Sequence, residues 1–170
     1  MTGPGSAAGH SGESRVRRVS SRTTWESDVG YSRAVAAGDF VFVSGCTSVD
    51  GAKFVHPGDA HAQTAQAIAN AAAGLAGLGA SLADVVQTRM FVTDIARWQE
   101  YGAAHGEAFG DVRPAATMVE VAALIDPGML VEIEVVAYLP GAGQVGQVGQ
   151  VGQVGQVGEV GQVGPGQRTR

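Results

Sequence analysis

The stretch that decides the fold is Arg33-Ala-Val-Ala-Ala-Gly-Asp-Phe-Val-Phe-Val-Ser-Gly45. Gly38-Asp39 lies between two apolar or β-branched runs, a pattern typical of a β-hairpin with a tight turn. In the second arm, Phe40 and Phe42 alternate with valines, so both faces of this strand carry large apolar side chains. The sequence therefore predicts a sheet that is covered on both faces.

Two helices are expected after this hairpin. From Asp59 to Leu78, apolar residues recur at helical spacing in an Ala-rich context, and Gly79 is placed to end that helix in a left-handed conformation. A capping turn at 81–84 and a strand at 85–93 follow. Asp94 is positioned to cap a second helix with aromatic side chains along one side.

Two apolar runs close the domain. Residues 115–124 and 130–139 are separated by Asp126-Pro-Gly128, which predicts an antiparallel pair joined by a tight turn. The expected order, including a weak strand at 15–20, is β-β-β-α-β-α-β-β, an α+β domain. Two helices cover one face of such a sheet. Exposed apolar surface costs about 25 cal/mol per Å², so the other face predicts self-association.

The two ends of the chain differ in composition from the middle. Residues 1–14 are rich in Gly and Ser and are expected to be a disordered tail. Residues 141–170 contain a Gly-Gln-Val repeat without an amphipathic face, which favours a flexible low-complexity tail over a collagen-like helix. The expected folded domain is 15–140.

Charge and cysteine content exclude several classes of protein. Residues 23–140 carry five Lys or Arg against fourteen Asp or Glu, a net charge of −9, which argues against a nucleic-acid partner. Cys46 is the single cysteine of the chain, which excludes an intrachain disulfide and favours the cytoplasm. No apolar run predicts a secretory signal or a membrane span.

Few residues stand out as chemical groups. No nucleotide-binding, hydrolase-elbow or zinc-protease motif is present, and no His pair has metal-ligand spacing, so no metal site is expected. Cys46 ends an apolar strand, where a packed thiol is favoured over a nucleophile. Three carboxylates interrupt apolar strands and need partners: Glu120, Glu132 and Glu134. Arg89, Arg113 or a neighbouring subunit could pair with them, or one could orient water in an interface cleft.

Several short motifs, in order from Tyr31 to Tyr138, resemble the RidA/YjgF family of reactive-intermediate deaminases. They are Tyr31-Ser32, Phe42-Val-Ser-Gly45, Ala62-Gln63-Thr64, Gly79-Ala-Ser-Leu-Ala-Asp-Val-Val-Gln-Thr88, Phe91-Val-Thr-Asp94, Arg113-Pro-Ala115, Val119-Glu-Val-Ala122 and Val131-Glu-Ile-Glu134. Each motif is weak by itself, but eight in sequence with compatible spacing are specific.

The resemblance implies a chorismate-mutase-like α+β fold, with two helices on one sheet face, assembled as a homotrimer with clefts between subunits. It also implies handling of enamines and imines without a cofactor. An Arg in a Pro-Ala-Arg-Ser motif then clamps the substrate carboxylate, and a last-strand Glu positions the water that hydrolyses the C=N bond. Here Ala116 stands in the place of that Arg, while Glu132 matches the last-strand carboxylate.

Other matched positions give the remaining candidate contacts. Tyr31 corresponds to a tyrosine near the cleft mouth, and Cys46 replaces the more usual Gln after Ser-Gly. Met118 and Glu120 are further candidate contacts on the strand that carries Ala116. Arg89 and Arg113 are the two cations that could replace the missing anchor.

Three functions are compatible with these residues. The retained Glu132 favours a hydrolase that acts on imines or enamines which need not carry a carboxylate. The replacement at Ala116 favours a trimer that binds a small metabolite without turnover. A ribonuclease or translation inhibitor is the least favoured, because residues 23–140 are acidic and carry no His pair.

Overall fold

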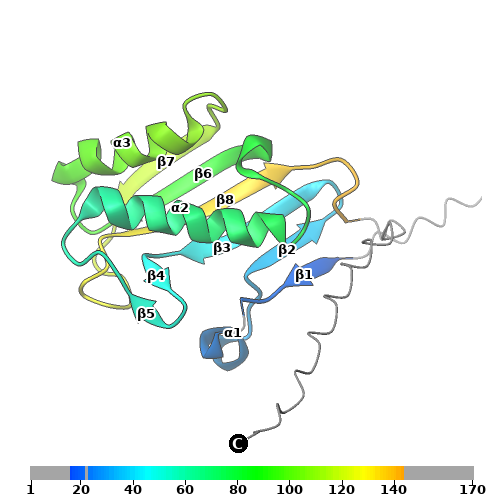
Figure 1. Cartoon of the computed structure of the whole chain (residues 1–170), viewed down its shortest axis with the longest axis horizontal. Coiled ribbons are helices and arrows are strands. Elements are labelled where there is room, and N and C mark those ends of the chain that lie inside the picture. Colours follow the sequence, from blue (N-terminus) through cyan, green and yellow to red (C-terminus); the bar gives the residue numbers. More distant parts are fainter. Residues whose placement is uncertain (1–15, 22, 144–170) are drawn as a thin grey trace, which may run out of the picture.

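The structure, a computed structural model, describes residues 16–21 and 23–143. In this part of the chain a six-stranded sheet carries two long helices on one face (Figure 1), which confirms the expected α+β class. In chain order the elements are β1 Arg17–Val19, α1 Thr24–Val29, β2 Ala34–Ala37, β3 Phe40–Cys46, β4 Val49–Asp50, β5 Lys53–Phe54, α2 Ala60–Ala76, η1 Leu82–Asp84, β6 Val85–Val92, η2 Ile95–Arg97, α3 Trp98–Phe109, β7 Ala115–Glu120 and β8 Val131–Tyr138.

The expected hairpin is present as β2 and β3. Ala37 pairs with Phe40, so the turn has two residues, and Gly38 adopts a φ of 60° that glycine tolerates without strain. The weak first strand is β1, which pairs antiparallel with β2.

The first long helix, α2, begins at Ala60, one residue after the expected start; Asp59 caps it, since its carboxylate accepts a hydrogen bond from the Ala62 amide. It ends at Ala76, two residues before the expected end. Gly79, with a φ of 86°, then turns the chain, and the Ala80 amide donates back to the Leu75 carbonyl.

The second long helix, α3, is preceded by the 3₁₀ turn η2. The Asp94 side chain caps η2 by accepting from the Ala96 amide. Tyr101 and Phe109 are buried as the pattern predicts, whereas Trp98 is exposed.

The predicted pairing of the last two strands is wrong. β7 runs parallel to β6 at the edge of the sheet, and β8 lies between β3 and β6 in the order β1-β2-β3-β8-β6-β7. A parallel pair needs a crossover, and α3 supplies it between β6 and β7. The turn at Asp126 is real, since the Met129 amide donates to its carbonyl, but it lies within a longer connection that crosses the sheet end.

Three further elements, α1, β4 and β5, were not predicted. α1 precedes β2, and β4 pairs with β5 in a separate two-stranded sheet. The ordered chain also continues past the expected boundary at 140, because Arg17 donates to the Ala142 carbonyl and the Gly143 amide donates to Gly38. The tails expected at 1–14 and beyond Gly143 lie outside the described residues.

The two faces of the sheet differ in cover. In β8 the odd-numbered residues 131–137 are buried beneath α2, while the side chains between them face the opposite side. On that side, here called the open face, Phe40, Phe42 and Tyr138 keep 43, 47 and 45 % of their surface exposed. This face therefore carries large apolar side chains that the described residues leave uncovered, as the sequence predicts for one chain by itself. Within the described residues, no helix has the length and apolar character needed to cross a membrane.

Candidate functional site

A β-bulge in β3 creates the local geometry of the candidate site. Between the pairs Val43 with Val135 and Cys46 with Ile133, β3 advances by three residues while β8 advances by two. A bulge of this kind bends the strand and leaves backbone groups out of the ladder. The bulge contains Ser44 and Gly45.

Glu132 lies on β8 against this bulge. A Cβ built on Gly45 would lie 1.8 Å from Glu132 Oε1, so the carboxylate occupies the space that the glycine leaves free. Burial raises the pKa of Glu132, the nearby Glu134 carboxylate raises it further, and the Arg33 guanidinium opposes both. Glu132 forms no ion pair with another residue of the described chain. Its carboxylate is half-buried and more basic than an ordinary glutamate.

Arg33 binds the backbone of the bulge. Its Nη1 donates to the carbonyls of Ser44 at 3.2 Å and Gly45 at 2.7 Å and lies 3.3 Å from Cys46 Sγ. Its Nη2 donates to the Tyr31 hydroxyl at 3.2 Å, and Arg33 Cζ lies 5.5 Å from the centre of the Tyr31 ring. Arg33 thus joins Tyr31 to the strand on which Glu132 packs.

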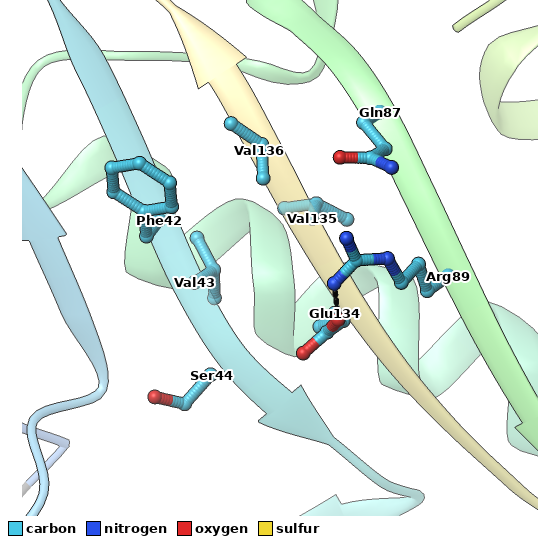
Figure 2. Close-up of a pocket in the computed structure, with 8 residues that line it drawn as sticks. All are labelled: Phe42, Val43, Ser44, Gln87, Arg89, Glu134, Val135 and Val136. Carbon is cyan, nitrogen blue, oxygen red and sulfur yellow. Dashed lines mark hydrogen bonds and ion pairs between the residues drawn. The ribbon is translucent and has the colours of Figure 1, made fainter. Parts of the chain in front are cut away.

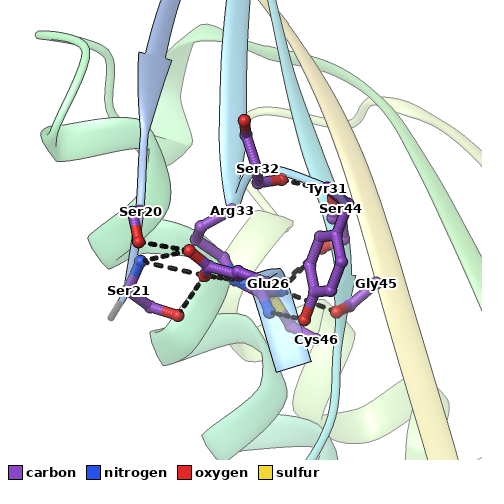
Figure 3. A network of polar contacts seen from close by, with 9 residues as sticks. All are labelled: Ser20, Ser21, Glu26, Tyr31, Ser32, Arg33, Ser44, Gly45 and Cys46. Carbon is purple, nitrogen blue, oxygen red and sulfur yellow. Dashed lines mark hydrogen bonds and ion pairs between the residues drawn. The ribbon is translucent and has the colours of Figure 1, made fainter. Parts of the chain in front are cut away.

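Glu26, on α1, forms an ion pair with Arg33. Figure 3 shows its carboxylate pointing toward the guanidinium, with an Nε to Oε1 separation of 3.8 Å. The carboxylate also accepts hydrogen bonds from Ser20 and from the Ser21 amide. Burial would raise the pKa of Glu26, but these hydrogen bonds and Arg33 lower it below its ordinary value. The pair is therefore charged and fixed.

Cys46 is buried in the core beside this network. Burial raises the pKa of its thiol, and the contact with Arg33 only partly opposes that effect. Its Sγ lies 3.3 Å from the Ser44 carbonyl oxygen, to which it donates. A buried thiol with a raised pKa is a packing group, not a nucleophile.

Arg89 and Glu134 face one another on the open face. Their Nη1 and Oε1 atoms are 2.6 Å apart, and both residues line a depression of about 290 Å³ between β3, β8 and β6 (Figure 2). Phe42, Gln87 and Val136 line the same depression. Of the partners considered for Glu134, the structure therefore shows Arg89, and this ion pair engages the Arg89 guanidinium.

The structure does not bring Ala116 and Met118 to Glu132 within one chain. Ala116 pairs with Thr88, and Met118 with Met90, which are buried partners on the helix-covered face of β6. Strand β6 lies between β7 and β8, so β7 and β8 are roughly 9.5 Å apart. Arg89, which projects from the open face, does not share the face of Ala116.

The last two candidates have local partners. Arg113 has a φ of 53° and its Nε donates to the Gly110 carbonyl at the end of α3, 3.2 Å away. Glu120 accepts a hydrogen bond from the Ile95 amide at 2.8 Å and so caps η2. In the described chain, neither Arg113 nor Glu120 forms a hydrogen bond or an ion pair with Glu132.

Sequence reasoning missed Arg33 and Glu26. A signal was present, because Arg33 lies two residues after Tyr31 and opposite the Ser-Gly pair of the hairpin. Glu26 lies in a helix that was not predicted. Within the described ranges, no cluster of three His, Cys, Asp or Glu is placed to hold a metal ion.

Comparisons with known proteins agree with this fold. The family described as Endoribonuclease L-PSP matches residues 22–139. An uncharacterized protein of Streptomyces coelicolor is 40 % identical over 123 residues, 72 % of this chain and 92 % of its own length. The 3-aminoacrylate deaminase RutC of Acinetobacter baylyi is 36 % identical over 110 residues, 64 % of this chain and 86 % of its own.

A solved structure gives the same result. Rv2704 of Mycobacterium tuberculosis, described as a member of the highly conserved YjgF/YER057c/UK114 family, is 50 % identical. The superposition has a TM-score of 0.67 and covers 73 % of this chain and 99 % of that one.

Proposed function

Because this chain belongs to the endoribonuclease L-PSP family, which includes the YjgF and RutC proteins, we propose that it hydrolyses imines or enamines in a cleft between subunits. The observation that carries the proposal is Glu132, a half-buried carboxylate with a raised pKa and no ion-pair partner in the described chain. The RutC relative, named as a 3-aminoacrylate deaminase, acts on a compound of this class.

The cleft is completed by self-association into a homotrimer. The open face exposes Phe40, Phe42 and Tyr138, and β7 is an edge strand of the sheet that the described residues form. Covering this face with other copies buries apolar surface that one chain leaves in water. The assembly brings Ala116 and Met118 of one copy to Glu132 of another. The buried thiol of Cys46 agrees with a cytoplasmic location.

Glu132 acts as a general base on water. Water adds to the carbon of the C=N bond and gives a proton to the carboxylate, which returns it to the nitrogen. In the carbinolamine that results, the hydroxyl proton passes to the nitrogen as the C–N bond breaks and the C=O bond forms, and the products are a carbonyl compound and ammonia. A raised pKa suits this role, because a base is most effective when its pKa lies near the working pH.

The substrate is a C=N compound without an essential carboxylate. A bidentate Arg contact is the strongest common way to hold a carboxylate, and Ala116 offers no donor. Arg89 is engaged by Glu134, and Arg113 by Gly110. Imines of small amino acids are therefore poor substrates.

An imine-trapping assay tests the function. An amine oxidase generates the imine, and semicarbazide traps whatever the protein has not hydrolysed. We expect the wild-type chain to lower the yield of trapped imine, and Glu132→Gln to leave it at the level without protein. Equal trapping with and without the wild-type chain, across carboxylate-free and carboxylate-bearing imines, would favour a binding trimer instead.

A further inference from the structure

The Arg33 guanidinium is largely enclosed by the protein. Its side chain is 15 % exposed, and each of its nitrogens has a partner. Nη1 binds the carbonyls of Ser44 and Gly45, Nη2 binds Tyr31, and Nε faces Glu26. Because the protein engages most of its donors, the role open to Arg33 in the site is one that acts through these partners.

The first partner is Tyr31. A phenol oxygen has one proton and can accept hydrogen bonds, whereas a guanidinium has donors and no acceptor. Because Arg33 donates to the Tyr31 oxygen, the phenol proton must point away from the guanidinium. Figure 3 shows the Tyr31 ring beside Gly45, the residue against which Glu132 packs. Arg33 thus turns Tyr31 into a donor directed away from the network.

The second partner is Glu132. The glycine whose carbonyl binds Arg33 at 2.7 Å is the glycine against which the Glu132 carboxylate lies. The other ionisable groups around Glu132 are Glu134 on its own strand, paired with Arg89 of β6, and the Cys46 thiol of β3. Arg33, which also pairs with Glu26 at 3.8 Å, is the positive charge that opposes the raised pKa of Glu132.

We infer that Arg33 is a positioning residue of this site, which directs the Tyr31 hydroxyl outward and supplies the positive charge that faces Glu132. Glu26 fixes the guanidinium in place. The inference rests on the proposed function for the chemistry of Glu132, but the contacts of Arg33 do not depend on it. The site then offers a ligand one carboxylate and one hydroxyl donor, while its cation stays behind the wall of the cleft.

The effect on Glu132 has a definite sign. A nearby positive charge favours the ionised carboxylate and lowers its pKa, so removal of Arg33 raises the pKa of Glu132. The full chain, labelled with ¹³C-glutamate, is titrated by NMR, and the Glu132 carboxyl signal is assigned by its loss in Glu132→Gln. We expect a higher midpoint in Arg33→Gln. Arg97→Gln is the matched control, since Arg97 pairs with Glu100 on α3, and it should leave the midpoint unchanged.

Arg33→Lys separates the two roles. Lysine keeps the charge, but one ammonium cannot reproduce the fork that binds the bulge carbonyls and Tyr31 together. We expect its Glu132 midpoint to stay near that of the wild type. Its kcat/KM should fall about tenfold, as in Tyr31→Phe, because each loses one oriented hydrogen bond to the substrate. The double variant, with Arg33→Lys and Tyr31→Phe together, should lose no more kcat/KM than either single variant.

Two outcomes would overturn the inference: an unchanged Glu132 midpoint in folded Arg33→Gln, or full activity in Arg33→Lys. If Arg33→Gln does not fold, Glu26→Gln with Arg33→Gln removes both buried charges, and the higher midpoint is expected there. A wild-type chain without turnover contradicts the proposed function alone, because the NMR titration needs no turnover.

Discussion

Replacing Gly45 with alanine tests whether the place of the Glu132 carboxylate matters. The added Cβ would lie 1.8 Å from Oε1, 2.7 Å from Cδ and 3.0 Å from Cγ of Glu132. Ordinary contact begins at 3.4 Å, so the carboxylate oxygen must move by about 1.6 Å. The clash is with the end of a flexible side chain, and Gly45 is not in the left-handed region. The strand can therefore keep its path while the carboxylate moves.

The expected result is a large loss of activity with little loss of stability. A displacement of about 1 Å of a catalytic group can cost roughly a hundredfold in rate. Alanine in a strand is favoured over glycine by about 0.5–1 kcal/mol, which offsets part of the cost of moving Glu132. We therefore expect a hundredfold lower kcat/KM, within about one decade, and a free energy of unfolding within about 1 kcal/mol of the wild type.

The assay is imine decay in the presence of semicarbazide, together with urea unfolding. Gly106→Ala is the matched control, since a Cβ at Gly106 of α3 meets no atom within 4 Å. That variant should keep its activity. Wild-type activity in Gly45→Ala would refute the argument that Glu132 works from the place it occupies beside the bulge.

Four further substitutions have defined outcomes. Burial raises the pKa of Glu132, so the folded state holds its proton more tightly than the unfolded state and the ionised form costs stability as pH rises. Glu132→Gln should therefore stabilise the chain more at pH 7 than at pH 4 in urea unfolding. Burial lowers the pKa of His105, so stability should fall as pH drops below its ordinary value of 6.5, and His105→Gln should flatten that fall. The buried Tyr101 hydroxyl has no hydrogen-bond partner in the described chain, so Tyr101→Phe should raise the free energy of unfolding by about 1 kcal/mol, measured by urea. Ala116→Arg should speed hydrolysis of imino acids by roughly tenfold to a hundredfold in the semicarbazide assay, and an unchanged rate would show that Arg89 or Arg113 already holds the carboxylate.

The sequence predicted those parts of the fold that local patterns determine. The β2–β3 hairpin depends on a two-residue turn, and α2 and α3 depend on helical spacing with Asp59 and Asp94 near their beginnings. The order of strands in the sheet depends on contacts between distant residues. β7 and β8 are neighbours in sequence, but β8 pairs with β3, some ninety residues before it. No periodicity within residues 115–139 indicates that choice.

The candidate site also combines features that local patterns predict with features that depend on distant contacts. The resemblance indicated Glu132 and Tyr31, but not that Gly45 makes room for the carboxylate. Arg33 and Glu26 join α1 to the bulge, and neither α1 nor the bulge has a strong local pattern. The pairing of Glu134 with Arg89 was among the sequence-based alternatives, because a carboxylate inside an apolar strand needs a partner.

The claim on which the account depends most is that other copies cover the open face, since this brings β7 of one chain to Glu132 of another. The measurement is the mass of the full chain at micromolar concentration, by light scattering after size exclusion. The account predicts about three times the chain mass of 17.2 kDa. A monodisperse species of one chain mass would contradict it, because Phe40 and Phe42 would then face water and the cleft would have no second wall.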